Sequence, residues 1–226
     1  MFVNNSTDLR SILQSIPYKA LLSLENARER RANALRQLKD LNIEAEWLVP
    51  IKANAIDWSS IPPAFRRAPK YGSHAVTMLA MFDEAIRRGV DTFMHIEDDV
   101  VFHHQILERL PNIFVPGNWR FIYLGGRSYG RRQKVSNGLV RSHAVGDLHA
   151  VVMRSDMIPL MKDALLDSKS NFQWCDARIS SLHKKWPAYL CRPNLAWQAP
   201  HCNDRGTGAP YSNYFEDGRV KPGQGE

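Results

Sequence analysis

The chain has 226 residues, of which 44% are apolar and 10% aromatic, and 30 Lys and Arg against 23 Asp and Glu give a formal net charge of +7. This composition is ordinary for a globular protein with one sizeable core, so it excludes the disordered, collagen-like and disulfide-scaffold classes. No run approaches the roughly 18 apolar residues that a membrane span needs. Residues 1–19 lack the apolar core of a signal peptide, so we expect a cytoplasmic protein without a transmembrane segment.

Short apolar runs alternate with longer helical patterns along the chain. The runs predict strands at residues 20–24, 46–51, 91–96, 120–124, 148–153 and 188–192. Helical spacing predicts helices at residues 27–43, at 73–89 and after Ser155, and Gly89 suits the position just after the second helix. The residues expected to face the core are Leu35, Leu38 and Leu41 in the first helix and Met78, Leu79, Phe82, Ala85 and Ile86 in the second.

The order of these elements indicates the fold class. Strands separated by helices of this length imply parallel crossovers and a sheet covered by helices on both faces. We therefore predict an α/β fold with a mostly parallel sheet in a single domain over residues 1–202. Residues 203–226 are rich in glycine, and we expect an irregular tail there. Gly125 and Gly126 end the fourth strand, where they let the backbone turn sharply or approach a ligand closely.

Three consecutive carboxylates, Glu97, Asp98 and Asp99, follow the third predicted strand. In open α/β sheets ligands bind at the carboxyl ends of strands, and adjacent carboxylates repel one another unless a cation holds them. Carboxylate oxygens suit Mg²⁺ or Mn²⁺, which complete their coordination with substrate phosphates and water. We therefore expect a nucleoside diphosphate or triphosphate as substrate. The structural alternative is an acidic turn that caps the next helix.

The three carboxylates are expected to have different roles. Side chains alternate along an extended segment, which places Glu97 and Asp99 on one side and Asp98 on the other. We predict Asp99 as the direct metal ligand. Glu97 would lie near the ribose or reach the ion through water, and Asp98 would orient a basic side chain or the sugar. His95, inside the same strand, is more typical of a buried sheet residue than of a ligand.

Several motifs follow one another in a recognisable order: SLENARERR, GSH at residues 72–74, IEDDVVF, FIYLGG, HAVVM and RPNLAWQ. Over most of residues 20–200 the sequence resembles the family-25 glycosyltransferases of lipopolysaccharide biosynthesis, which have a GT-A fold with a Rossmann-type sheet. The resemblance implies metal-dependent transfer of glucose or galactose from a nucleotide sugar, expected to be UDP-linked, to an acceptor hydroxyl, with inversion at the anomeric carbon. It also implies that Arg30 lies on the nucleotide side, that Ser73 and His74 line the donor pocket, and that the acidic cluster binds the metal. His149 matches a histidine of the family.

Inverting transfer needs a base for the acceptor hydroxyl and neutralisation of the departing diphosphate. We predict Asp176 as the base, because Phe172 and Trp174 precede it and could stack on a sugar face, with Asp147 as second choice. A helix N-cap is the structural alternative for Asp176. His201 lies where a late loop could return to the metal, and a surface histidine is the alternative there.

The stretch from Arg127 to Arg141 contains no acidic residue. We expect Arg127, Arg131 and Arg132, together with Trp174, to contact an anionic acceptor, and a solvated loop is the alternative. Two acceptors stay open: a phosphorylated cell-surface glycan or lipo-oligosaccharide, and a hydroxymethylated base in DNA, which would have to be flipped out. A non-catalytic nucleic-acid-binding module would leave the acidic cluster unexplained. A sugar-phosphate nucleotidyltransferase would need a glycine-rich phosphate loop, which the segment after the first strand lacks.

Overall fold

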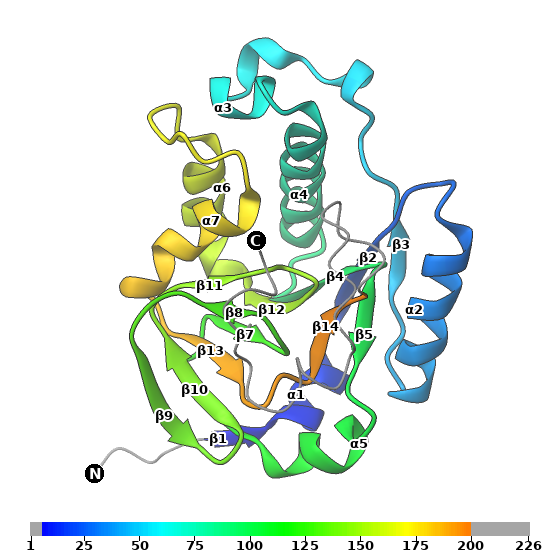
Figure 1. Cartoon of the computed structure of the whole chain (residues 1–226), viewed down its shortest axis with the longest axis vertical. Helices are drawn as coiled ribbons and strands as arrows, with labels where there is room; N and C mark the ends of the chain where they lie inside the picture. The colour runs from blue at the N-terminus through cyan, green and yellow to red at the C-terminus, as the bar shows by residue number, and fades with distance from the viewer. Residues whose placement is uncertain (1–5, 200–226) are drawn as a thin grey trace, which may run out of the picture.

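The computed structural model describes residues 6–199, and its main feature is an eight-stranded sheet (Figure 1). Its strands are, in spatial order, β3 (Glu46–Leu48), β2 (Tyr18–Leu22), β4 (Thr92–Glu97), β12 (Ala150–Arg154), β7 (Phe121–Tyr123), β13 (Ala188–Cys191), β10 (Leu139–Ser142) and β9 (Arg132–Ser136). Six of these strands overlap the six that the apolar runs predict, which confirms these elements and the α/β class.

Smaller sheets and helices complete the fold. Three further sheets have two strands each: β1 (Ser6–Asp8) with β6 (Phe114–Pro116), β8 (Arg127–Ser128) with β11 (Val145–Gly146), and β5 (Val100–Phe102) with β14 (Ala196–Gln198). The α-helices are α1 (Leu9–Ser15), α2 (Arg28–Asp40), α3 (Pro63–Arg66), α4 (Pro69–Arg87), α5 (Ile106–Arg109), α6 (Ile158–Leu166) and α7 (Cys175–Ser180). Within residues 6–199, none of the helices combines the length and the apolar character that crossing a bilayer requires.

Strand β12 departs from the predicted parallel arrangement. β2 pairs in parallel with β3 and β4, and β7 pairs in parallel with β13, but β12 is antiparallel to both of its neighbours, β4 and β7. Helices connect β2 to β3 and β3 to β4, as parallel crossovers require. The chain between β7 and β12, all of it described, contains short strands and no helix. The expectation of a parallel crossover is therefore wrong for β12, and the sheet is mixed.

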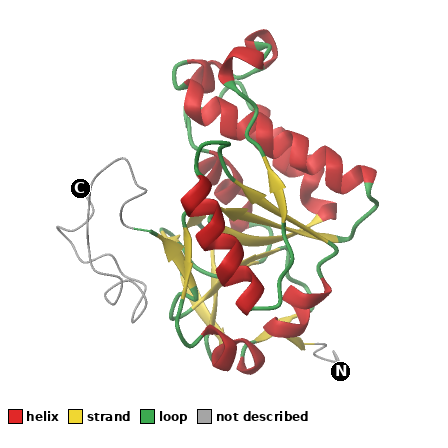
Figure 2. Cartoon of the chain, turned by 90° about the vertical axis from the view of Figure 1, so that its right-hand side faces the viewer, coloured by secondary structure: helices red, strands yellow, loops and turns green. Residues whose placement is uncertain are grey.

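Helices cover both faces of the main sheet, as predicted (Figure 2). Side chains along β4 and β12 alternate between two buried clusters, with Met94 and Val152 in the first and Phe93 and Val151 in the second. Residues of α1 and α2 belong to the first cluster, and residues of α4, α6 and α7 belong to the second. The sheet therefore has a buried core on each face, and these two cores hold the carboxyl ends of its strands in place.

Helix α4 begins earlier than predicted and ends where predicted. Pro69 is its first residue, a position where the missing N–H removes no helical hydrogen bond, and Gly89 follows its last turn with a φ of 64°. Its buried residues are Gly72, Ala75, Thr77, Met78, Met81, Phe82 and Ala85. Two residues of the predicted apolar stripe are not fully buried: Leu79 is half-buried and Ile86 is 56% exposed. In α2, Leu35 is likewise exposed, contrary to prediction.

Gly125 lets β14 pass close to the end of β7. A Cβ atom at Gly125 would lie 1.7 Å from the carbonyl oxygen of Ala196. The backbone N–H groups of Leu195 and Ala196 donate to the carbonyl of Leu124 at 2.6 and 3.1 Å. The close approach predicted at Gly125 is therefore to another strand of the same chain, and it carries Gln198 to the carboxyl end of β4.

Candidate functional site

Glu97 is the last residue of β4, and Asp98 and Asp99 form the turn that leads into β5. The backbone N–H of Glu97 donates to the carbonyl of His149 at 3.0 Å, and that of Asp98 donates to the carbonyl of Leu22 at 3.1 Å. The acidic cluster is thus held between β12 and β2 at the carboxyl end of β4, where the sequence predicted it. A strand follows the cluster, so it does not cap a helix.

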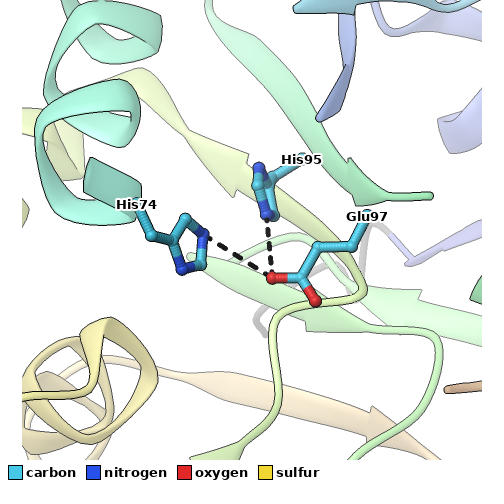
Figure 3. Close-up of side chains that lie close together, drawn as sticks. All are labelled: His74, His95 and Glu97. Atoms are coloured by element: carbon cyan, nitrogen blue, oxygen red, sulfur yellow. Dashed lines mark ion pairs between the residues drawn. The ribbon is translucent and has the colours of Figure 1, made fainter. Parts of the chain in front are cut away.

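Two histidine rings lie beside Glu97 (Figure 3). His74 comes from α4, and His95 comes from β4, two residues before Glu97. The Nε2 atom of each ring lies 3.6 Å from Oε1 of Glu97, and the rings stack with their centroids 5.7 Å apart. Gln198 donates from Nε2 to the other carboxylate oxygen, Oε2, at 3.4 Å. The carboxylate is therefore approached from α4, β4 and β14.

Several buried polar atoms around the cluster have no partner within hydrogen-bonding distance among the described residues. They are Nε2 of His74, both ring nitrogens of His95, Nδ1 of His149, Oδ2 of Asp98 and Oδ1 of Asp99. A buried polar atom left unsatisfied typically costs about 1–3 kcal/mol, and native proteins hold few of them. Their concentration in one corner points to a polar ligand.

The carboxyl groups of the cluster differ in proton affinity. Burial, and then the charges of Glu97 and Asp98, raise the pKa of Asp99 well above its ordinary value. Burial also raises the pKa of Asp98, although the charge of Arg30, whose Nε lies 3.6 Å from Oδ1, opposes the shift. Burial alone would raise the pKa of Glu97, but contact with His95 and the charges of the nearby histidines, when protonated, lower it. Negative charge is therefore concentrated on Glu97, beside an acid that is costly to ionise.

These features fit a bound divalent cation. The oxygens of Glu97 and Asp99 are the hard ligands that Mg²⁺ and Mn²⁺ prefer, and a cation would remove the repulsion that raises the pKa of Asp99. Burial lowers the pKa of His74, so its ring is neutral at pH 7 and offers a lone pair. Among the described residues, the ligand atoms that lie within 4.8 Å of one another are those of His74, His95 and Glu97, so the role of Asp99 as the direct ligand stays a prediction.

The two predicted base candidates, Asp147 and Asp176, lie in contact. The backbone N–H of Asp147, which has a φ of 71°, donates to Oδ2 of Asp176 at 3.0 Å. The carboxylate of Asp147 is 2.6 Å from Nη2 of Arg127. Asp176 lies in the first turn of α7, and Trp174 is the N-cap, so the helix-cap alternative for Asp176 is wrong. Burial and the charges of Asp147 and Glu97 raise the pKa of Asp176, against the backbone hydrogen bond that it accepts from Asp147.

Arg30 and Ser73, predicted to face the donor, each contact another residue of this chain. Arg30, from α2, faces Asp98. The sequence predicts that Asp98 orients either a basic side chain or the sugar. Ser73 precedes His74 on α4, but its hydroxyl donates to the carbonyl of Ile51. Ser73 therefore ties α4 to the segment after β3.

A pocket of about 310 Å³ lies after the carboxyl ends of β2 and β3, and none of the three acidic residues lines it. It is lined by Leu24, Glu25, Asn26, Val49, Pro50 and Lys52. Lys52 and Glu25 form an ion pair of 2.9 Å. The pocket lies at the edge of the sheet where α/β folds bind ligands.

The predicted acceptor residues lie on separate elements. Trp174 is 40% exposed, and its ring meets that of Tyr71 of α4 edge-on with centroids 6.2 Å apart. Arg131 and Arg132 are exposed where β9 begins. Arg127 of β8 forms an ion pair with Asp147. Trp174, Arg131 and Arg132 therefore make no contact with the acidic cluster that the structure records.

Sequence reasoning missed two side chains of the site. His95 is buried in the sheet as predicted, but its ring faces Glu97. The signal that could have identified His95 is alternation, because residues two apart lie on the same face of a strand. Gln198 has no such signal, because only the fold brings β14 to the cluster. His201, predicted as a metal ligand, and the predicted tail at 203–226 lie outside the described residues.

No family model matches the sequence, and no curated protein matches it. Among solved structures, A197 from STIV has 15% identity and a TM-score of 0.43, over 76% of this chain and 80% of that chain. A UDP-glucose pyrophosphorylase complexed with UDP-glucose has 10% identity and a TM-score of 0.43, over 80% and 75%. A mannose-1-phosphate geranyltransferase from Thermus thermophilus has 10% identity and a TM-score of 0.41, over 77% and 73%. Likenesses of this size identify neither a family nor an activity.

Proposed function

We propose that this protein is a metal-dependent, inverting glycosyltransferase that moves glucose or galactose from a UDP-linked sugar to an acceptor hydroxyl. The observation that carries the proposal is the acidic cluster at the end of β4. Asp99 lies there beside Glu97 with a buried, unpartnered oxygen and a raised pKa. A divalent cation relieves both conditions, and such ions commonly bind substrate phosphates as well.

The donor would extend from the acidic cluster into the pocket beyond β2 and β3. Glu97 and Asp99 would hold the cation, which when bound neutralises charge on the departing diphosphate. The nucleoside would occupy the pocket lined by Leu24 and Val49.

Asp176 is the better candidate for the base that accepts the proton of the acceptor hydroxyl. Its carboxylate accepts N–H groups from Asp147 at 3.0 Å and Ala177 at 2.8 Å, which leaves lone pairs for an acceptor hydroxyl. Asp147 is engaged instead by Nε and Nη2 of Arg127 at 2.6 to 3.2 Å. Asp147 is committed to this ion pair, and its backbone N–H serves to position Asp176.

The acceptor would approach over the exposed Trp174 and the basic residues at β9. We propose a phosphorylated cell-surface glycan first, in line with the sequence resemblance. A hydroxymethylated base in DNA is the second candidate, favoured by the exposed Arg131 and Arg132, because clustered cations attract a nucleic-acid backbone. Both acceptors are polyanions, so salt dependence does not separate them, and direct assays on each are required.

The test is a transfer assay with UDP-glucose and UDP-galactose in the presence of Mn²⁺, offered a phosphorylated lipid-linked oligosaccharide or DNA that contains hydroxymethylcytosine. We expect transfer to one acceptor, and a loss of at least about 100-fold with excess chelator or in Asp99→Asn, because a metal ligand is removed. Asp163→Asn, an exposed carboxylate on α6, is the matched control and should keep full activity. Undiminished turnover in chelator would refute the metal role, and no transfer to either acceptor from any nucleotide sugar would refute the function.

A further inference from the structure

The side chains of His74, His95 and Glu97 meet at the end of β4, and the two histidines lie outside the acidic motif. We propose that His74, His95 and Glu97 are joint ligands of the cation, so that this site takes a transition-metal ion such as Mn²⁺ in preference to Mg²⁺. The inference rests on the proposed function for the role of the cation, and on the residues themselves for the site.

The geometry allows one ion to reach all three side chains. Two ligand atoms that each lie about 2.1 Å from one ion are at most about 4.2 Å apart. The Nε2 atoms of His74 and His95 each lie 3.6 Å from Oε1 of Glu97, inside this limit. The three ligand atoms lie within 4.8 Å of one another, so small ring movements suffice to close the site. Figure 3 shows both rings directed at the same carboxylate oxygen.

Hydrogen bonding separates His95 from another buried histidine in the same fold, His183. His183 is fully buried, and both of its ring nitrogens have partners, the hydroxyl of Tyr123 and the backbone N–H of Val145, each at 3.2 Å. His95 is 1% exposed, and neither of its ring nitrogens has a hydrogen-bond partner among the described residues. A buried histidine with one ring nitrogen beside a carboxylate and neither nitrogen hydrogen-bonded is poised for a ligand.

The surroundings hold the carboxylate in the orientation that a metal site needs. Gln198 donates to Oε2 of Glu97, which leaves Oε1 toward the two rings. The backbone N–H of Glu97 is fixed by the carbonyl of His149. Groups that orient metal ligands in this way are a regular part of metal centres and contribute to affinity.

The donor set determines which cation is preferred. Mg²⁺ takes oxygen ligands and retains water, whereas imidazole nitrogen binds first-row transition ions. Two imidazoles with a carboxylate therefore select a transition ion over Mg²⁺, and the carboxylate oxygens of the cluster remain compatible with Mn²⁺. The same assignment makes His74 a metal ligand rather than a contact of the sugar.

The first experiment uses the metal-free wild-type chain with Mn²⁺ alone, without donor or acceptor. Pulsed electron paramagnetic resonance of the bound Mn²⁺ should show couplings to imidazole nitrogen, and calorimetry should give at least tenfold tighter binding of Mn²⁺ than of Mg²⁺. Mn²⁺ bound without nitrogen coupling, equal affinity for both ions, or no binding of either would overturn the inference. This measurement requires no variant, so it is independent of any effect of mutation on folding.

Variants then assign the nitrogens to residues. His74→Gln and His95→Gln should each weaken Mn²⁺ binding by at least tenfold while changing the affinity for Mg²⁺ by less than threefold, and each should reduce the nitrogen coupling. His104→Gln, an exposed histidine, is the matched control and should bind as the wild type does. An unchanged preference for Mn²⁺ in folded variants would contradict the assignment.

The inference and the proposed function fail in different ways. A chain that binds Mn²⁺ through nitrogen but transfers no sugar would refute the function and leave this site standing. A chain that transfers sugar with Mn²⁺ bound through oxygen alone would refute this site and leave the function standing.

Discussion

Asp147 illustrates how single residues in this site are fixed by their neighbours. Its φ of 71° is a backbone conformation that residues other than glycine rarely adopt, and such strain persists only where surrounding contacts enforce it. Arg127 holds its carboxylate while its N–H is given to Asp176. The strained backbone therefore serves to aim an N–H group at the proposed base.

The assignment of base and positioning residue is tested by comparing two variants. Asp176→Asn should lower kcat by about 10²–10⁴-fold with little change in donor KM, because it removes the proton acceptor. Asp147→Asn should have a smaller effect on kcat, because the backbone N–H that positions Asp176 remains. The reverse order of effects, measured in the transfer assay, would exchange the two roles.

The pH profile gives a second readout of the same assignment. The base must be ionised to act, and the pKa of Asp176 is raised, so wild-type kcat/KM should fall with decreasing pH at a value above the 3.8 of an ordinary Asp. Asp176→Asn should lose this acid limb, whereas Asp147→Asn should retain it.

At this scale, the sequence predicted that the three carboxylates follow a strand, whereas the metal role of this cluster and the two base candidates stay predictions, and several of their contacts were not foreseen. Glu97 and Asp99 were identifiable because three carboxylates in a row, directly after an apolar run, repel one another unless a cation holds them. His95 shares a strand face with Glu97, yet a histidine within a strand is usually structural. Gln198 and the ion pair of Arg127 depend on contacts between distant segments, which no local pattern encodes.

Among the elements, β14 matters most to the site because it lies against the end of β7 at Gly125. The close approach of Ala196 leaves no space for a side chain at Gly125. The backbone N–H of Ala199, just after β14, also donates to the carbonyl of Asp99 at 2.7 Å. β14 thus braces the acidic cluster from outside the main sheet.

Replacement of Gly125 tests this bracing. Gly125→Ala should lower the free energy of unfolding by about 2–3 kcal/mol, because the added Cβ meets a backbone carbonyl, and should also weaken Mn²⁺ binding as β14 moves. Gly89→Ala is the control: it costs about 1–2 kcal/mol through its positive φ, meets no atom within 4 Å, and should leave Mn²⁺ binding unchanged. Wild-type metal affinity in Gly125→Ala, measured with denaturation curves alongside, would show that β14 does not support the site.

Sequence patterns located the elements better than their directions. The six main strands follow from runs of apolar residues, and the end of α4 follows from Gly89. The direction of β12 does not follow from such runs, since a strand that returns through hairpins looks locally the same as one that returns through a helix. The short strands β8 to β11 were missed because the stretch that contains them is polar and basic, without a buried alternation.

For the molecule as a whole, one group of exposed basic side chains lies apart from the acidic cluster. Arg131, Arg132 and Lys134 are exposed at β9, on the edge strand of the main sheet, while the acidic cluster lies at the end of β4. A basic surface attracts a polyanion most strongly at low ionic strength. The two regions therefore suit the two substrates, with the donor at the acidic end and an anionic acceptor near the basic edge.

Charge reversal separates these two regions. The double variant Arg131→Glu and Arg132→Glu should raise acceptor KM by about tenfold or more at low salt, because attraction becomes repulsion, while donor hydrolysis changes little. Arg10→Glu with Arg36→Glu, an equal charge change at exposed positions elsewhere, is the control. Equal losses of transfer and donor hydrolysis in the β9 variant would reject an acceptor role for this edge.

The most direct test of the whole account is an anomalous diffraction map, recorded at the manganese edge, of crystals grown with Mn²⁺ and UDP. The account predicts one strong peak among Glu97, Asp99 and the rings of His74 and His95, with the diphosphate on its open side and the uridine in the pocket after β2 and β3. A map without manganese at this corner, or with these carboxylates turned toward solvent and UDP bound elsewhere, would contradict it.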